Sequence, residues 1–224
     1  MKIRGVLFDL DGTLLDQDGA VDDALRRWLP TLGVAPEPHV LARWHEIQER
    51  HLGAWRERRI TFAEQRRRRL RDFLPEVGVA AAAPDLDHIF AGYLRCYQAS
   101  WRAFDDADDA LTAVAAAGLA VAVLTNGTTE QQNDKLARVG LAGRVGPVWT
   151  VDNLGVAKPD TGAFLGACAR WGLPPAAVLS VGDRHDLDVL PARAAGLSAV
   201  LLDRHGTGPA DEPHRVGSLR ELTF

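Results

Sequence analysis

Two aspartates near the start of the chain flank a single residue where an apolar run ends. Asp9 and Asp11 lie in the segment Phe8-Asp9-Leu10-Asp11-Gly12, and the glycine allows a sharp turn with exposed backbone N–H groups. Two carboxylates held this close repel each other, so they must bind a cation or share a proton. A structural turn can also be rich in Asp and Gly. The pair therefore indicates metal or acid–base chemistry only if other reactive groups meet it.

Polar side chains also follow the next two apolar runs. Thr125 and Asn126 follow residues 119–124 and precede a helix pattern, where a hydroxyl, N–H groups and the helix dipole can bind an oxyanion. Lys158 follows the run at 147–151 and precedes a proline, so its backbone is extended and its side chain can point over the sheet edge. Only three of the 26 basic residues are Lys, and an ammonium is a compact charge for a phosphate or a carboxylate. Read singly, these residues can also be a common turn, a helix cap and a surface lysine.

A fourth apolar run, residues 177–181, is followed by Gly182 and three aspartates. Asp183 comes first and is expected to point at the site, Asp186 is expected to cap a helix, and Asp188 either caps it or reaches inward. The neighbouring Arg184 and His185 are expected to face solvent or to contact substrate. Four successive strand ends thus carry an acid pair, a hydroxyl, an ammonium and a further acid. Because the carboxyl ends of parallel strands meet at one sheet edge, coincidence is a poor explanation.

The elements that must position these residues alternate between short apolar runs and amphipathic stretches. Buried strands are expected at residues 4–10, 119–124, 147–151, 177–181 and 198–202, and helices at 106–117, 128–139, 160–171 and 186–195. Gly118, Gly140, Gly172 and Gly196 are expected to end helices, whereas Asp105, Asp106, Thr128 and Asp160 are expected to begin them. This order predicts an α/β fold with a Rossmann-like parallel sheet.

The stretch between the first two strands contains no strand-like run. Prolines divide it into four expected helices, at residues 22–32, 38–52, 61–73 and 85–101. The predicted domains are therefore an α/β Rossmann-like catalytic core at 1–17 and 104–224 and an inserted α-helical cap domain at 18–103, with hinges near 16–19 and 103–105. We expect Trp28, Trp44, Trp55 and Trp101 to lie mainly in the core of this cap. The Arg-rich stretch at 56–69 is expected to be a solvated helix face, with a subset reaching an anionic substrate as the alternative.

Composition narrows the classes of partner. The chain has 224 residues, a net charge of −4, 46% hydrophobic and 25% charged residues, which suits a medium globular domain carrying one insertion. Its mildly acidic balance argues against nucleic acid or an anionic membrane as a main partner. No apolar run approaches the roughly 20 residues of a membrane helix, and no signal-peptide cleavage site is present. Cys96 and Cys168 fit no metal spacing and are expected to be buried thiols. A cytoplasmic location is the resulting expectation.

The set of strand-end motifs resembles the haloacid dehalogenase (HAD) superfamily of aspartate-nucleophile hydrolases. Its four motifs are matched in order by Asp9-Leu10-Asp11-Gly12-Thr13, by Leu124-Thr125-Asn126-Gly127, by Lys158-Pro159-Asp160, and by Gly182-Asp183 with Asp188 five positions on. The similarity covers essentially the whole chain, and the helical insertion resembles the cap of subclass I. One departure is Pro191, where glycine is usual, and we expect a local packing change there without loss of chemistry.

The resemblance implies a site for Mg²⁺ and a covalent mechanism. Asp9 and Asp183 would supply carboxylates to the ion, and Asp11 its backbone carbonyl. Asp9 would attack phosphorus to form an aspartyl-phosphate, while the Asp11 side chain would protonate the leaving alkoxide and then deprotonate water. Thr125, the Asn126 backbone and Lys158 would stabilise the phosphate oxygens, and Asp188 would orient Lys158 or a metal-bound water. These residues form the catalytic, substrate-phosphate-binding and metal site that the resemblance implies.

The expected function is Mg²⁺-dependent hydrolysis of phosphomonoesters of small metabolites, by a monomer or a homodimer. A phosphomutase or phosphotransferase of the same superfamily is the first alternative, because the aspartyl-phosphate can pass to a sugar hydroxyl. A 2-haloacid dehalogenase is disfavoured, because dehalogenases of the family typically lack the second aspartate of the first motif, and a halide needs no proton on leaving. A non-catalytic binding module is the last alternative, against which the presence of all four motifs argues.

Overall fold

A six-stranded parallel sheet forms the centre of the part of the chain that carries the predicted site. The computed structural model describes residues 2–224 and orders the strands β3-β2-β1-β4-β5-β6. The strands are β1 (Gly5–Phe8), β2 (Ala120–Leu124), β3 (Val148–Trp149), β4 (Val178–Gly182), β5 (Ser198–Leu202) and β6 (Arg215–Val216). Every neighbouring pair is parallel. The chain adds β2 and β3 on one side of β1 and then β4, β5 and β6 on the other side, so the order of the strands switches between β1 and β4. Open α/β sheets bind their ligands at the carboxyl ends of the strands beside such a switch point.

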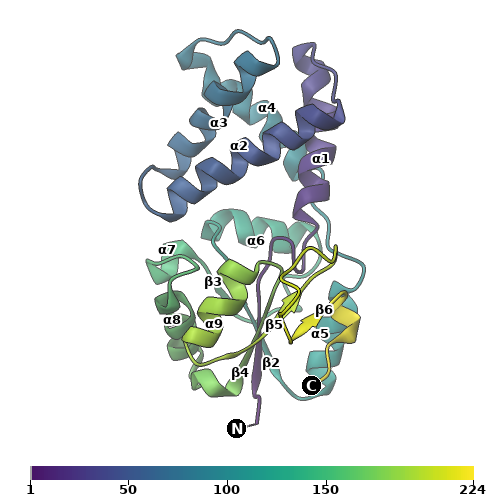
Figure 1. The fold of residues 1–224 in the computed structure, drawn as a ribbon, viewed down its shortest axis with the longest axis vertical. Helices are drawn as coiled ribbons and strands as arrows, with labels where there is room; N and C mark the ends of the chain where they lie inside the picture. Colours follow the sequence, from purple (N-terminus) through teal and green to yellow (C-terminus); the bar gives the residue numbers. More distant parts are fainter. Residues whose placement is uncertain (1) are drawn as a thin grey trace. The chain divides into compact units, whose positions relative to one another are not determined.

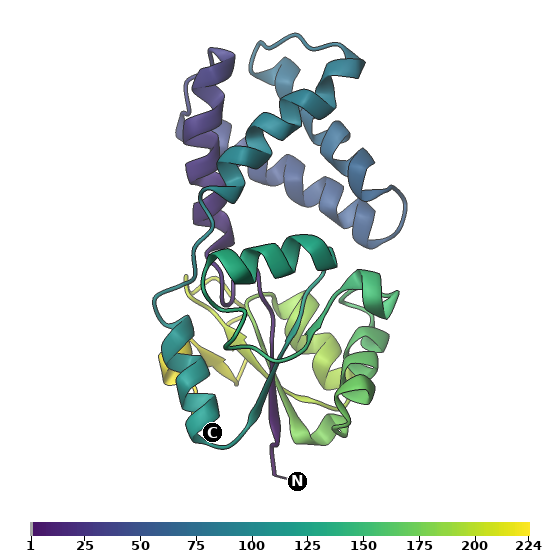
Figure 2. The ribbon, with the colours of Figure 1, turned by 180° about the vertical axis from the view of Figure 1, so that it is seen from behind.

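Helices cover both faces of this sheet, and successive side chains of β1 pack against the helices on alternate faces. Val6 and Phe8 pack with residues of α5 and α6 on one face, and Leu7 packs with residues of α8 and α9 on the other. Figures 1 and 2 show these two helical layers from opposite sides. The helices are α5 (Ala107–Ala116), α6 (Thr129–Arg138), α7 (Val151–Leu154), α8 (Thr161–Trp171) and α9 (Leu190–Ala194). The predicted α/β fold with a parallel sheet is confirmed.

The chain divides into two compact units. The α/β unit comprises Met1–Gln17 and Arg102–Phe224, and the helical unit comprises Asp18–Trp101. No helix in the described part of the chain combines the length and the apolar character that crossing a membrane requires.

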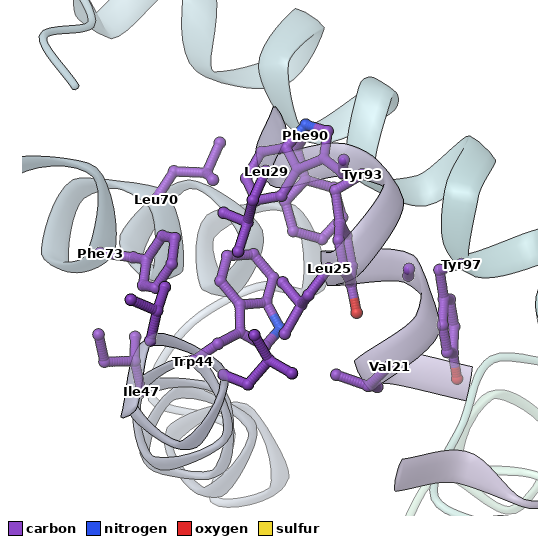
Figure 3. Packing of buried hydrophobic residues seen from close by; sticks show 14 of the residues in the cluster. Val21, Leu25, Leu29, Trp44, Ile47, Leu70, Phe73, Phe90, Tyr93 and Tyr97 are labelled. Carbon is purple, nitrogen blue, oxygen red and sulfur yellow. The ribbon is translucent and has the colours of Figure 1, made fainter. Parts of the chain in front are cut away.

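The helical unit has a core of its own, in which aromatic side chains pack among aliphatic ones. Its helices are α1 (Gln17–Trp28), α2 (Pro38–Arg56), α3 (Phe62–Glu76) and α4 (Leu86–Gln98), with a 3-10 turn at Leu29–Leu32. Trp44 is fully buried, and its ring lies 4.9 Å from that of Phe73 and 4.7 Å from that of Tyr93 (Figure 3). Trp28 packs edge-on against Trp44. The expected core positions of Trp28 and Trp44 are therefore confirmed.

One arginine of the predicted solvated stretch is buried instead. Arg67 and Arg68 form exposed ion pairs with Asp87 and Glu64, as a solvated helix face requires. Arg69 of α3 is only 5% exposed, and its guanidinium lies over the Trp44 ring. A guanidinium tolerates this position because aromatic faces attract it. The sequence of four consecutive arginines did not indicate which of them is buried, because four consecutive residues of a helix point in four directions.

Most of the expected helix ends are confirmed by the backbone. Gly118, Gly140, Gly172 and Gly196 all have positive φ, between 68° and 88°. Thr128 and Asp160 accept backbone N–H bonds at the starts of α6 and α8. Asp106 precedes α5 but caps nothing with its side chain, contrary to expectation. Its carboxylate binds the C-terminal segment instead.

Three elements differ from the expectation. The strand expected at 147–151 is only two residues long, since α7 begins at Val151. β6 was not predicted from the sequence, because a strand of two residues is too short to show a periodic pattern. The helix expected at 186–195 begins as a wide turn over His185–Val189 before α9. Pro191 has no N–H to continue an i→i−4 ladder across this junction, which accounts for the break.

Candidate active site

Lys158 lies between two carboxylates at the carboxyl edge of the sheet. Its Nζ donates to Asp9 Oδ1 at 2.5 Å and to Asp188 Oδ1 at 2.6 Å. Asp9 directly follows β1, and its backbone N–H donates to the carbonyl of Val181 in β4. All three charged side chains are at least nine-tenths buried. The strand ends thus bring together residues that lie 149 positions apart in the chain.

Asn126 holds the backbone of Lys158 in place. Its Nδ2 donates to the Lys158 carbonyl and its Oδ1 accepts from the Lys158 N–H, both at 2.8 Å. This amide pairing joins the end of β2 to the segment that precedes α8. Both polar ends of the Asn126 side chain are therefore engaged within the protein.

Asp188 reaches inward from the wide turn before α9. Its Oδ1 accepts from Lys158, and its Oδ2 accepts from the backbone N–H of Arg184 at 3.0 Å. A Cβ on Gly182 would lie 2.4 Å from the Asp188 side chain, so only glycine fits beside it. The prediction that Asp186 caps a helix is wrong, because its carboxylate pairs with the Arg184 guanidinium at the surface.

Asp183 is held by the loop that follows β1. The Thr13 hydroxyl accepts from the Asp183 N–H at 3.1 Å and lies 3.4 Å from the Asp183 Oδ1, to which it donates. Gly12 has a φ of +94°, and a Cβ there would come within 2.4 Å of Asp183 Oδ2. Gly12 and Thr13 therefore fit this loop tightly against Asp183. The sequence pattern contained both residues but assigned Thr13 no contact.

Burial and mutual repulsion raise the pKa of two of these carboxyl groups. Burial is the main cause for Asp9, whose pKa is raised to about 7, with Lys158 opposing the shift and Asp188 adding to it. Burial likewise raises the pKa of Asp183 to about 8, and the charges of Asp9 and Asp188 contribute. Burial also disfavours the Lys158 ammonium, but Asp188 and Asp9 outweigh it, so the pKa of Lys158 lies above its usual value. The cluster needs more positive charge than Lys158 provides.

The same cluster has the ligand chemistry of a hard cation. Ligand oxygens of Asp9, Asp183 and Asp188 lie within 4.8 Å of one another. Asp9 Oδ2 is buried and has no hydrogen-bond partner, which is costly unless a cation is bound. Because both Asp188 oxygens are already engaged, Asp9 and Asp183 are the carboxylates with capacity for an ion. Oxygen donors of this kind suit Mg²⁺.

Thr125 is buried at the end of β2 with its oxygen engaged as an acceptor. Its Oγ1 accepts from Gln132 Nε2 at 2.6 Å and from the Gly127 N–H at 3.3 Å. A hydroxyl has two acceptor positions and one donor, so the remaining function of this group is to donate. Thr125 is thereby oriented as a donor, as binding of a phosphate oxygen requires.

Asp11 is held by two residues of α6 that the sequence reasoning did not identify. Lys135 Nζ donates to Asp11 Oδ1 at 2.6 Å, and Gln132 Nε2 donates to Asp11 Oδ2 at 2.8 Å. Lys135 and Gln132 are 2% and 1% exposed. One signal was available in the sequence, because Lys135 is one of only three lysines and lies three residues after Gln132 on one helix face.

Known proteins are similar to this chain along most of its length. Phosphoserine phosphatase from Thermus thermophilus is 33% identical over 200 residues, spanning 87% of this chain and 76% of that protein. A Bacillus subtilis protein described as a HAD-hydrolase, solved bound to magnesium, has a TM-score of 0.84 at 23% identity, covering 99% of this chain and 97% of its own. A structure described as a dehalogenase has a TM-score of 0.79 at 26% identity, covering 98% of this chain and 95% of its own.

The family itself follows from the sequence. The family model for the haloacid dehalogenase-like hydrolases matches residues 3–196, which include every residue of the site described above. The resemblance drawn from the four motifs is thereby confirmed. With its aspartates, threonine and lysine gathered at one edge of a parallel sheet, the chain belongs to the haloacid dehalogenase-like hydrolases.

Proposed function

We propose that the protein hydrolyses phosphate monoesters of small metabolites, with Asp9 as the nucleophile and Mg²⁺ as the cofactor. The observation that carries the proposal is the separation of the two motif aspartates onto different partners. Lys158 holds Asp9, whereas Lys135 and Gln132 hold Asp11. A nucleophile and an independent acid–base group are what cleavage of a phosphate ester needs. The phosphatase name of the Thermus thermophilus relative supports this reading.

Asp9 has the surroundings of a nucleophile. Its Oδ1 is fixed by Lys158 and its Oδ2 has no hydrogen-bond partner, so the carboxylate is oriented but not saturated. Attack on phosphorus forms an aspartyl-phosphate and breaks the bond to the ester oxygen. Lys158 and the Thr125 hydroxyl donate to the phosphoryl oxygens, whose charge they stabilise. Asp188 keeps Lys158 in position through the 2.6 Å ion pair.

The proposed cation site consists of the Asp9 and Asp183 carboxylates and the Asp11 backbone carbonyl. Bound there, Mg²⁺ would neutralise the nucleophile and the phosphate so that two anions can approach each other. The four buried or half-buried aspartates of the site face two ammonium groups, Lys158 and Lys135. A divalent cation bound there would balance the remaining negative charge.

Asp11 has the position of the general acid and base. Its carboxyl group gives a proton to the departing alkoxide, and the resulting carboxylate then takes a proton from the water that hydrolyses the aspartyl-phosphate. Inorganic phosphate and free Asp9 result, so the cycle closes without any other reactant. A halide would leave without that proton, and therefore the presence of Asp11 favours esters over haloacids.

The rest of the proposal concerns the setting of the reaction. We assign the α/β unit as the catalytic core and the helical unit, predicted at residues 18–103, as a cap that selects the substrate and excludes water. The enzyme would act in the cytoplasm as a monomer or homodimer, on small phosphorylated metabolites and without nucleic acid or membrane partners. Its acidic net charge of −4 supports the last point.

The test is release of inorganic phosphate from a panel of phosphorylated metabolites, with Mg²⁺ and with EDTA. We expect release that EDTA abolishes and that Asp9→Asn reduces to background while the variant stays folded. Asp186→Asn is the matched control, because that carboxylate pairs with Arg184 at the surface, and it should retain activity. Full activity of Asp9→Asn would contradict the mechanism. Phosphate appearing on an added sugar instead of in water would indicate a phosphotransferase, and chloride release from 2-chloropropionate would indicate a dehalogenase.

A further inference from the structure

Both carboxylate oxygens of Asp11 are taken by donors from a single helix. Lys135 Nζ lies 2.6 Å from Oδ1, and Gln132 Nε2 lies 2.8 Å from Oδ2. The two donors are three residues apart on α6, so they project from the same face. The Asp11 side chain is 25% exposed, whereas Lys135 is buried. The carboxylate therefore keeps one open side while its orientation is fixed from the other.

Burial of the Lys135 ammonium costs free energy unless acceptors are placed to compensate its charge. A buried ammonium needs paired acceptors, and here these are Asp11 and, at 3.3 Å, Gln17 Oε1. An apolar residue facing the sheet would avoid this cost, as Leu136 does on the neighbouring helix position. The buried lysine thus sits where its main effect is on Asp11.

Gln132 links Asp11 to the phosphate-binding edge. The same Nε2 group donates to Asp11 Oδ2 and to Thr125 Oγ1. A Cβ on Gly127 would lie 2.2 Å from this amide, so the turn after Thr125 leaves room for nothing but glycine. One amide group therefore sets the relative position of the hydroxyl and the carboxylate.

We propose that Lys135 and Gln132 are positioning residues that hold the Asp11 carboxyl group for proton transfer to the leaving oxygen; this inference rests on the proposed phosphatase function. Both residues hold the Asp11 carboxylate from α6, and Gln132 also holds the Thr125 hydroxyl. With its two oxygens held, Asp11 cannot rotate toward Asp9 or the neighbouring cation site. Their removal should slow the step that needs a proton and leave other steps largely unchanged.

The leaving group separates this role from a purely structural one. Benzyl phosphate releases a strongly basic alkoxide, which needs a proton, whereas p-nitrophenyl phosphate releases a weakly basic phenolate, which does not. We compare kcat/KM for the two esters, because this parameter reports the steps up to leaving-group departure. For Lys135→Met we expect a loss with benzyl phosphate at least about ten-fold larger than with p-nitrophenyl phosphate. Lys135→Arg, which retains a cation, should recover part of the difference.

Two comparisons complete the experiment. Arg138→Met removes a cation that pairs with Asp134 on the exposed face of the same helix. This variant should not lower kcat/KM for benzyl phosphate or for p-nitrophenyl phosphate. Asp11→Asn should show the same dependence on the leaving group, and adding Lys135→Met to it should cause no further selective loss. Circular dichroism and urea unfolding establish that each variant is folded.

The outcomes are distinct. A greater loss with benzyl phosphate that disappears in the Asp11→Asn background supports the positioning role. An equal loss with both esters, or an undiminished loss in that background, overturns it and leaves the phosphatase function standing. If Lys135→Met does not fold, Gln132→Met and Lys135→Arg are judged by the same ratio. Absence of wild-type turnover with every ester overturns the proposed function itself, and the positioning role with it.

Discussion

Charge compensation among a few buried residues dominates the site at the residue scale. Lys158 is the shared partner of Asp9 and Asp188, while Lys135 is the partner of Asp11. Each ammonium is a compact charge that donates to two acceptors, Asp9 and Asp188 for Lys158 and Asp11 and Gln17 for Lys135. The raised pKa values of Asp9, to about 7, and Asp183, to about 8, show that burial of these acids is only partly offset. Such a cluster is sensitive to removal of any one charge.

Replacement of Lys158 tests this balance. Lys158→Met should lower the free energy of unfolding by about 3 kcal/mol in EDTA, because Asp9 and Asp188 are left buried without their cation. The double variant Lys158→Met/Asp188→Leu removes one of the two stranded acids and should recover part of that loss. Urea unfolding measures both. If the double variant proves less stable than the single one, the carboxylate of Asp188 is not the source of the instability.

At the scale of elements, Asp106 ties α5 to the C-terminal segment. Its carboxylate accepts two bonds from Arg204, each at 2.8 Å, together with the Ser218 hydroxyl at 2.7 Å and the Leu219 N–H at 2.9 Å. Burial would raise the pKa of Asp106, but these donors outweigh it and lower the pKa to about 2. Arg204 also stacks over the Phe104 ring. A side chain at the start of a helix thus anchors residues 98 to 113 positions away in the chain.

This clamp makes a prediction about pH. The ordinary pKa of about 3.8 applies in the unfolded chain, so ionised Asp106 stabilises the fold above that pH, and the contribution disappears as pH falls through 2. The shift corresponds to about 2 kcal/mol at neutral pH. The difference in unfolding free energy between the wild type and Asp106→Asn should therefore shrink as pH is lowered from 5 to about 2.

Asp109→Asn provides the control for that comparison. Asp109 lies on the same helix and pairs with Arg220, but both side chains are more than half exposed. Its effect on stability should be small and nearly independent of pH. A difference for Asp106→Asn that stays constant across this pH range would show that the clamp does not act through its charge.

At the scale of the whole molecule, the two units have separate hydrophobic cores. The cluster around Trp44 contains residues of the helical unit alone, and the two clusters flanking the sheet contain residues of the α/β unit alone. All residues of the candidate site belong to the α/β unit. Stability of the helical unit can therefore change without direct loss of packing around the site.

Hydrogen exchange measures this independence. Trp44→Ala should cost about 3–5 kcal/mol locally and reduce amide protection in the segment 18–101. Amides of β1, β2 and β4 should keep their protection. Phe164→Ala, which opens the core between α8 and the sheet, should show the opposite distribution. Uniform loss of protection in both variants would mean that the two cores unfold as one.

Much of the fold followed from local patterns. Five of the sheet's six strands, and the helices between them apart from the short α7, were predicted, because apolar runs and 3.6-residue periodicity are properties of short segments. The failures lie where periodicity is absent or overridden, as in β6 and in the wide turn before Pro191. Arg69 was assigned to solvent because no local signal distinguishes a buried arginine from its neighbours.

The amino-acid sequence alone determined which chemical groups stand at the strand ends, and hence the family. Parallel strands deliver their carboxyl ends to one edge, so spacing along the chain sufficed to gather Asp9, Thr125, Lys158 and Asp183. Only the tertiary structure decided which donor meets which acid. Lys135 contacts Asp11 across 124 residues, and that contact depends on the rotation and depth at which α6 packs. Such quantities arise from packing between distant segments, which no local pattern encodes.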